Sequence, residues 1–323
     1  MHLVQVCNVG EIVGGTAACA WTVTQALPGW QHTVLFLTRI TEATRAAFAN
    51  ANIAAVSHVD ARRLRSLRAD IVLLHNSSPS RVQAISSVPA IMYQHSVGQR
   101  TSAQRKVYCS RWLARACDDP HGDVLLQAVP IPPRPTNGES RSLRTRLKIG
   151  RICTPNARKW PTELVPFYAE LARRFPAVDW EFVGCPVSLE RELSEACQGR
   201  AAFHPAGWSA RSHLWHWDAL LYHNPALPES FGRVVAESLR SGCVPIVDAL
   251  GGFTEQFPPE AGFLCSSRAD FREALEQISQ PGTLWSMSRT ALAHGNEHFS
   301  LLRFQDSLLE LFEQTGLPAR REH

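Results

Sequence analysis

The sequence predicts an α/β protein with two Rossmann-like, doubly wound parallel-sheet domains facing a cleft. Three observations predict this fold class: short runs rich in Val, Ile and Leu alternate with helix-length segments, the alternation occurs in two sets, and a proline-rich stretch separates the sets. Runs that are apolar throughout indicate strands buried on both faces of a sheet, and the segments between them indicate crossover helices. A length of 323 residues suits two domains.

The first set of elements occupies the N-terminal part of the chain. A helix is expected at 16–27, after the glycine turn GEIVGG, and strands are expected at 2–9, 32–38, 70–76 and 89–95. The stretch AVPIPPRPTNGES, residues 128–140, contains four prolines and little to bury, so it predicts an extended crossover. Residues 1–135 are therefore expected to form an N-terminal Rossmann-like domain.

The second set of elements follows the crossover. Helices are expected at 162–175 and 188–197, and strands at 147–153, 179–184, 218–224, 243–249 and 262–265. Residues 136–300 are therefore expected to form a C-terminal Rossmann-like domain. The tail at 299–314 spaces its apolar residues at intervals of three and four, which predicts an amphipathic helix. Residues 301–323 would then be a C-terminal helix, able to pack back on the N-terminal domain.

Charge and composition exclude several function classes. The formal net charge is only +4, and the arginine-rich segments at 62–68 and 140–146 lack interleaved aromatic residues. We interpret these segments as solvated helix faces and a linker, and we expect no nucleic-acid partner. The apolar start MHLVQVCNV lacks a basic leader and is too short to span a bilayer. A cytoplasmic protein is expected, and peripheral contact with a membrane stays open.

Nine cysteines and thirteen histidines raise the question of a disulfide framework or a metal site. No C-x-x-C pair occurs, several cysteines lie in apolar strand-like runs, and their number is odd, which favours reduced thiols. His213 and His216 lie one helical turn apart in HLWHW, but apolar residues surround them, so we interpret them as packing or surface histidines. We expect no metal and no cofactor.

A short helix is expected within the segment PESFGRVVAESLRSG, residues 228–242. Its apolar face would consist of Phe231, Val234, Val235 and Leu239. Gly242 is placed to end the helix in the left-handed conformation. The backbone N–H groups near Phe231, Gly232 and Arg233, at the start of the helix, can face an anion or hydroxyl groups.

Two glutamates accompany this helix. Glu229 lies just before it, and Glu237 lies eight positions later, two turns in. A carboxylate accepts two hydrogen bonds side by side, which matches the vicinal diol of a ribose or a pyranose. The pair could therefore hold two diols of one sugar nucleotide. The spacing by itself also suits an ordinary helix, with one glutamate near its N-terminus for dipole reasons and one exposed glutamate later.

PESFGRVVAE resembles the E-x7-E motif of retaining glycosyltransferases with the GT-B fold, the family 4-like or group 1 transferases. The resemblance continues through SGCVPIVDALGGFTEQF. IGRICTPNARKWP at 149–161 is similar to the opening strand of the family's second domain, and VGGTAACAW is similar to the double-glycine loop of its first domain. The match covers most of the chain and is dense from 215 to 257.

The resemblance implies a transferase that moves a hexose-type sugar from a nucleotide-diphosphate donor to an acceptor, keeping the anomeric configuration. The N-terminal domain would bind the acceptor and the C-terminal domain the nucleotide sugar. The acceptor stays open between a glycan, a lipid, a small molecule and a protein. The chain is short for the family, and Thr16–Ala17–Ala18 replaces the acidic residue that many members carry after the double glycine.

The resemblance also implies roles for single residues. Arg151 and Lys159 would contact the donor diphosphate from one loop and stabilise it as it leaves, so a divalent metal is unnecessary there. Glu237 would accept the ribose hydroxyls, and Glu229 the hydroxyls of the transferred sugar. The remaining donor-binding positions would act through close backbone approach, and they are Gly14, Gly15, Phe231, Gly232, Arg233 and Val234.

His95, at the end of the run IMYQH, lies where the family often has a histidine near the reacting sugar. Its expected neighbour is the His75–Asn76 pair, at the end of another strand, because carboxyl ends of parallel strands lie at one edge of a sheet. A purely structural role for His95 stays open. For Gly251 and Gly252, a simple turn after a strand stays open as well.

Two other function classes remain. A nucleotide-sugar epimerase on the same fold would act on the donor without an acceptor, and a non-catalytic protein would bind a nucleotide sugar without turnover. A dinucleotide-binding oxidoreductase is excluded, because no G-x-G-x-x-G pattern follows the first strand.

Overall fold

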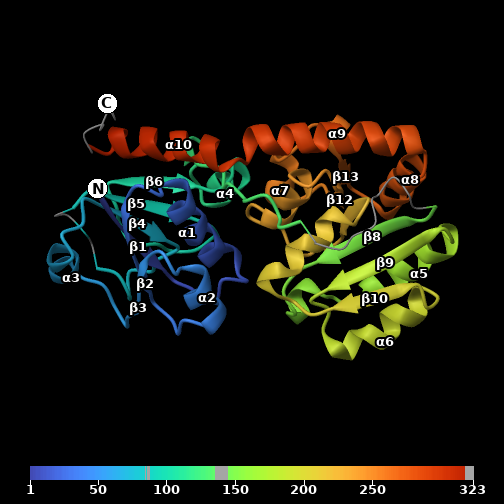
Figure 1. Ribbon diagram of the computed structural model, residues 1–323, viewed down its shortest axis with the longest axis horizontal. Helices are drawn as coiled ribbons and strands as arrows, with labels where there is room; N and C mark the ends of the chain where they lie inside the picture. Colours follow the sequence, from blue (N-terminus) through green and yellow to red (C-terminus); the bar gives the residue numbers. More distant parts are fainter. Residues whose placement is uncertain (84, 86–87, 135–144, 317–323) are drawn as a thin grey trace. The chain divides into compact units, whose positions relative to one another are not determined.

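A computed structural model describes residues 1–83, 85, 88–134 and 145–316 of the chain. The chain divides into two compact units, one of Met1–Val129 together with the chain from Phe299 onward, and one of Pro130–His298. Each unit contains one parallel sheet covered by helices (Figure 1), which confirms the predicted fold class. The predicted boundary at 135/136 lies outside the described residues.

The first unit is built on a seven-stranded sheet with the order β3-β2-β1-β4-β5-β6-β7, and all of its strand pairs are parallel. The strands are β1 (His2–Cys7), β2 (Gln31–Phe36), β3 (Asn52–Ala55), β4 (Ile71–His75), β5 (Ala90–Gln94), β6 (Arg105–Tyr108) and β7 (Asp123–Val124). The helices are α1 (Gly15–Ala26), α2 (Glu42–Ala47), α3 (Ala61–Ser66), α4 (Arg111–Ala116) and α10 (Leu301–Gln314).

The helix α10 completes the first unit although it comes from the end of the chain. Phe304, Leu308, Leu311 and Phe312 form its buried face, as the amphipathic pattern of the sequence predicts. The rings of Trp30 and Phe312 lie 5.5 Å apart between centroids. The backbone N–H of Val129 donates to the carbonyl of Phe299 at 3.1 Å, where the chain enters α10. Segments nearly 300 residues apart therefore share one core.

The second unit is built on a six-stranded parallel sheet with the order β10-β9-β8-β11-β12-β13. The strands are β8 (Leu147–Ile152), β9 (Val178–Val183), β10 (Ala201–His204), β11 (Ala219–Tyr222), β12 (Val244–Asp248) and β13 (Phe263–Cys265). The α-helices are α5 (Leu164–Arg174), α6 (Val187–Ala196), α7 (Arg233–Leu239), α8 (Arg268–Ile278) and α9 (Pro281–His298). The 3-10 helices are η2 (Ala157–Lys159), η3 (Trp208–Trp215), η4 (Gly251–Glu255) and η5 (Pro259–Ala261).

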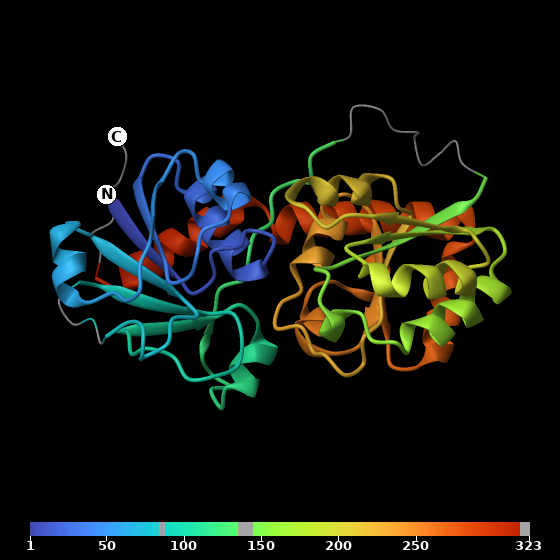
Figure 2. The same cartoon turned by 90° about the horizontal axis from the view of Figure 1, so that it is seen from below.

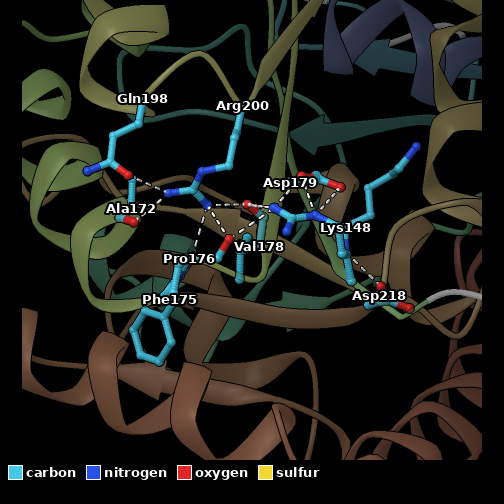
Figure 3. Close-up of polar contacts among 10 residues, drawn as sticks. Lys148, Ala172, Phe175, Pro176, Val178, Asp179, Gln198, Arg200 and Asp218 are labelled. Carbon is cyan, nitrogen blue, oxygen red and sulfur yellow. Dashed lines mark hydrogen bonds and ion pairs between the residues drawn. The ribbon is translucent and has the colours of Figure 1, made fainter.

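Helices α5 and α6 lie side by side against the second sheet in both views (Figures 1 and 2). The guanidinium of Arg200 fixes the connection between α5 and β9 (Figure 3), because it donates to the carbonyls of Ala172 at 2.6 Å and Val178 at 2.6 Å. At the start of β8, the Asp218 carboxylate accepts from the backbone N–H of Lys148 at 2.8 Å. The contact from Asp218 holds β8, the strand that leads to the candidate site.

The strand order places a topological switch point in each sheet. In the first sheet, the chain runs outward from β1 in one direction and from β4 in the other, and β8 and β11 do the same in the second sheet. Open α/β sheets bind ligands at the carboxyl ends of two such neighbouring strands. Gly242 has a φ of +66°, and it follows α7 in the left-handed conformation that the sequence predicts. Among the described residues, none of the helices has the length and apolar character needed to cross a bilayer.

Candidate functional site

The switch point of the second sheet brings Lys159 and Glu229 together. Lys159 comes from η2 after β8, and Glu229 comes from the loop after β11. The Lys159 ammonium Nζ lies 2.7 Å from Glu229 Oε1, and the two side chains are 24% and 20% exposed. The Tyr222 hydroxyl donates to the same carboxylate oxygen at 2.8 Å. Burial, and then the neighbouring Glu229 carboxylate, raise the pKa of Tyr222, so its hydroxyl stays protonated and able to donate.

Arg151 lies beneath this ion pair rather than beside it. Its side chain is 0% exposed, and its guanidinium donates to the carbonyls of Lys159 at 2.6 Å and His223 at 3.2 Å. The guanidinium also lies over the rings of Tyr222 and Trp160, at 4.4 Å and 5.0 Å from their centroids. This corrects the expectation that both cations face the donor from one loop. Arg151 instead holds the turn that presents Lys159.

Gly251 and Gly252 support the loop that carries Glu229. Gly251 has a φ of +66°, and a Cβ at this position would lie 2.5 Å from the carbonyl oxygen of Glu229. The N–H of Gly252 donates to the same carbonyl at 2.7 Å. Because the two backbone segments approach this closely, the glycines do more than turn the chain after β12. They fix the backbone of Glu229, from which its carboxylate reaches Lys159.

We expect Gly251→Ala to destabilise the second unit more than Gly199→Ala does. Both glycines have a left-handed backbone, but a Cβ at Gly199 would meet nothing within 4 Å. Gly199→Ala should lower the free energy of unfolding by about 1–2 kcal/mol, which is the cost of this conformation for an L-residue. Gly251→Ala should cost at least about 1 kcal/mol more, because the backbone of Glu229 must shift. Thermal denaturation of both variants measures the difference, and equal losses would contradict this account.

Glu237 belongs to a second ionic cluster, on α7. Its Oε1 lies 3.6 Å from Arg211 Nη1 of η3 and 3.9 Å from Arg233 Nε, one helical turn earlier. The Glu237 side chain is only 9% exposed, so Glu237 is not the exposed helical glutamate that the spacing alone allows. Burial lowers the pKa of Arg211, and the nearby Glu237 carboxylate opposes this shift. The cluster presents a carboxylate that two cations hold in place.

The helix α7 is shorter than the sequence pattern predicts. It begins at Arg233, and Gly232 precedes it with a left-handed φ of +79°. Phe231, which was expected on the apolar face of the helix, lies before it and is buried, and its carbonyl accepts from the Gln256 amide. The Phe231 side chain is therefore part of the core, whereas Gly232, Arg233 and Val234 remain partly exposed.

The first unit contains the other predicted site residues. His75 ends β4 and His95 follows β5, and His75 Nδ1 lies 3.0 Å from His95 Nε2. Gln5 Oε1 lies 2.9 Å from His75 Nε2, and Gln127 Nε2 lies 2.9 Å from His95 Nδ1. The Asn76 side chain accepts from the His95 backbone N–H at 2.8 Å, so the predicted neighbours of His95 are confirmed. Burial lowers the pKa of His75 to about 3, which keeps this histidine neutral.

The double glycine of the first unit lies at the start of α1. Gly14 is the N-cap residue, with an extended backbone, and Gly15 is the first residue of the helix. The structure thus places Gly14, Gly15 and His95 in the first unit and the five charged residues of the prediction, Arg151, Lys159, Glu229, Arg233 and Glu237, in the second.

Sequence reasoning did not single out three side chains that shape the site. Tyr222 is the last residue of β11, and its strand-end position was a usable signal, because strand ends meet at the switch point. His223 Nδ1 contacts Asp248 Oδ1 at 2.7 Å across neighbouring strands, which only the strand order reveals. Arg211 carried no local signal, since Glu237 lies 26 positions away in the sequence.

The comparisons with known proteins agree on the fold. No protein-family model matches the chain, and no curated protein matches it in sequence. HepE from Anabaena, solved in complex with UDP-glucose, has a TM-score of 0.78 at 14% identity, over 97% of this chain and 100% of that chain. A glycosyltransferase from Rickettsia africae ESF-5 has a TM-score of 0.76 at 14% identity, over 97% and 98% of the two chains.

Sucrose-phosphate synthase from Thermosynechococcus elongatus is also similar, with a TM-score of 0.72 at 14% identity over 97% of this chain and 98% of that chain. These structures are GT-B glycosyltransferases. The likeness covers both units, and at these identities it shows the fold alone. The predicted pair of Rossmann-like domains is therefore confirmed as the GT-B type of fold.

Proposed function

We propose that this protein is a glycosyltransferase that moves a hexose-type sugar from a nucleotide-diphosphate donor to an acceptor, with retention of the anomeric configuration. The observation that carries the proposal is the Lys159–Glu229 ion pair of 2.7 Å at the switch point of a GT-B fold. A structural neighbour of the same fold was solved with UDP-glucose bound. Glycosyl transfer is the reaction that this fold and this arrangement of charges support together.

The reaction breaks the bond between the sugar and the diphosphate, so negative charge develops on the departing oxygen. A cation fixed beside that oxygen lowers the barrier, because it needs no reorganisation when the charge appears. The Lys159 ammonium suits this task, since Arg151 holds its backbone and Glu229 holds its side chain. We propose that Lys159 stabilises the leaving diphosphate and that Arg151 is a positioning residue, and that a divalent metal is unnecessary for this step.

Both glutamates are engaged with cations, which suits binding rather than nucleophilic attack. Glu229 contacts Lys159 and Tyr222, and Glu237 lies between Arg211 and Arg233. We propose that Glu229 accepts hydroxyls of the transferred sugar and Glu237 those of the ribose. A departing phosphate oxygen would then deprotonate the acceptor on the same face of the sugar, which gives retention without a carboxylate nucleophile of the glycosidase kind.

We expect Glu237→Gln to weaken binding of the donor about 10- to 100-fold, because one charge-assisted hydrogen bond to a diol is lost. The amide keeps the size of the side chain. Isothermal titration with the nucleotide sugar measures the change, and Glu192→Gln, at an exposed position of α6, is the matched control. Equal donor affinity in the two variants would remove Glu237 from the donor site.

The proposal is tested with a panel of nucleotide sugars, each incubated alone and with acceptors from four classes: glycans, lipids, small molecules and proteins. A transferase should release nucleoside diphosphate faster when the right acceptor is present, and NMR of the product should show the anomeric configuration of the donor. Epimerised donor in the absence of acceptor would instead identify an epimerase. Saturable binding without turnover over the whole panel would identify a non-catalytic nucleotide-sugar-binding protein.

A further inference from the structure

We propose that Glu181, His204 and His213 form a binding site for a divalent transition metal ion such as Zn²⁺, which ties η3 to the second sheet. None of these three side chains has a part in the proposed transfer. The inference rests only on contacts inside the second unit, so it stands or falls independently of the proposed function.

Three different elements bring the donor atoms together. Glu181 lies on β9, His204 is the last residue of β10, and His213 lies on η3. Glu181 Oε2 lies 3.3 Å from His213 Nδ1 and 3.6 Å from His204 Nε2. All three donor atoms lie within 4.8 Å of one another. A carboxylate and two imidazoles are a ligand set that zinc uses in proteins, with one position left for water.

The spacing of these atoms fits one tetrahedral ion. Zinc bonds to nitrogen and oxygen measure about 2.0–2.1 Å, so two ligand atoms of a tetrahedral site lie about 3.3–3.4 Å apart. The two distances from Glu181 Oε2, 3.3 Å and 3.6 Å, come close to this separation. The side chains of His204 and His213 are 34% and 26% exposed, which leaves a path from solvent to the site.

One polar atom of the cluster, His204 Nε2, lacks a hydrogen bond within the described part of the chain. His204 Nε2 is buried, and it has no hydrogen-bond partner among the described residues. A buried ring nitrogen without a hydrogen bond loses its hydration at a cost in free energy.

The surroundings orient the carboxylate for this task. Lys148 Nζ lies 2.7 Å from Glu181 Oε1, and the Trp217 ring N–H donates to Glu181 Oε2 at 2.8 Å. Lys148 and Trp217 therefore hold both oxygens of the Glu181 carboxylate in place. Partners of this kind fix the direction of a metal-binding side chain.

A second cluster, of Cys19, His75 and His95 in the first unit, is less suited to a metal ion. The two ring nitrogens that face each other there lie 3.0 Å apart, which is a hydrogen-bond distance. The outer nitrogens of both rings contact glutamine side chains. These histidines already have partners on both sides, in contrast to His204.

The test uses the full chain without a histidine tag, stripped of metal and titrated with Zn²⁺ at neutral pH against a competing chelator. We expect one equivalent to bind, and His204→Ala and His213→Ala each to weaken binding about 100-fold or more. The matched control is His298→Ala. His298 belongs to another close histidine pair of the same unit, with ring centroids 4.1 Å apart from His294, and its loss should change nothing.

Two further measurements decide the location of the ion. Saturating Zn²⁺ should raise the melting temperature of the wild-type chain by about 5–10 °C and leave both histidine variants unchanged. Co²⁺ in place of Zn²⁺ should give tetrahedral absorption without a thiolate-to-metal charge-transfer band. A thiolate band would place the ion at a cysteine and overturn the proposal. Absence of stoichiometric binding, or equal affinity in the wild type and both variants, would also overturn it.

Discussion

Replacing Lys159 with alanine is expected to lower kcat about 100-fold or more on a donor and acceptor that the wild type accepts. The reason is electrostatic: the ammonium is the cation held 2.7 Å from Glu229 at the switch point, and fixed charges aimed at a leaving group contribute on this scale. The Michaelis constant for the donor should change much less, because the interaction strengthens as the diphosphate departs. Initial-rate measurements of nucleoside diphosphate release give both constants.

Arg158→Ala is the matched control for this prediction. Arg158 is the neighbouring residue of η2 and is exposed. Its backbone N–H donates to the Asn156 side chain at 2.9 Å, and its backbone carbonyl accepts from the Asn224 side chain at 2.9 Å. The control removes one positive charge from the same turn without touching Glu229. Turnover in Lys159→Ala that equals turnover in Arg158→Ala would show that general positive charge matters and that Lys159 has no specific role.

Arg151→Ala is expected to lower the free energy of unfolding of the second unit by about 3–5 kcal/mol. The change removes a fully buried side chain and leaves a cavity. It also removes the hydrogen bonds that the guanidinium donates to the carbonyls of Lys159 and His223. Thermal denaturation measures the loss. At a temperature where the variant stays folded, kcat should still fall, because the turn that presents Lys159 has lost its anchor.

Arg146→Ala provides the comparison, because Arg146 forms an exposed ion pair with Asp179 at 2.8 Å on the same sheet. Such a pair is worth at most about 1 kcal/mol. The variant Arg151→Lys separates charge from geometry. It keeps the positive charge but cannot reach both carbonyls in the same way as a planar guanidinium. Full activity and stability in Arg151→Lys would show that the charge suffices and would contradict the positioning role.

Most strands of both sheets were predictable because they are buried on both faces. β1, β4, β5 and β12 have every residue buried, and such strands stand out as continuous apolar runs. The strand β3 escaped the prediction because it is an edge strand with mostly exposed residues. β10 is also an edge strand, and its four residues are only partly buried or exposed. The central strand β6 also escaped the prediction, because its first two residues, Arg105 and Lys106, are charged, whereas the edge strand β13 was predicted at 262–265.

The candidate site was predictable in its residue types and only partly in its geometry. The family resemblance brought Lys159 and Glu229 into one hypothesis, and the structure joins them directly. Nothing in the sequence marks Arg151 as buried, because its burial depends on the rings of Tyr222 and Trp160, which come from other elements. His213 shows the same limit, since its partner in space is Glu181, 32 positions earlier, and not the neighbouring His216.

The assignment of α10 to the first unit has a consequence for synthesis of the chain. The ribosome completes every strand of both sheets, the last of which ends at Cys265, before it makes Leu301–Gln314. Until then, Trp30 and the adjoining face of α1 lack the aromatic partner that Phe312 supplies. The second unit can thus finish folding while the first unit still lacks α10. This order reverses the usual sequence in which nascent domains mature from the N-terminus.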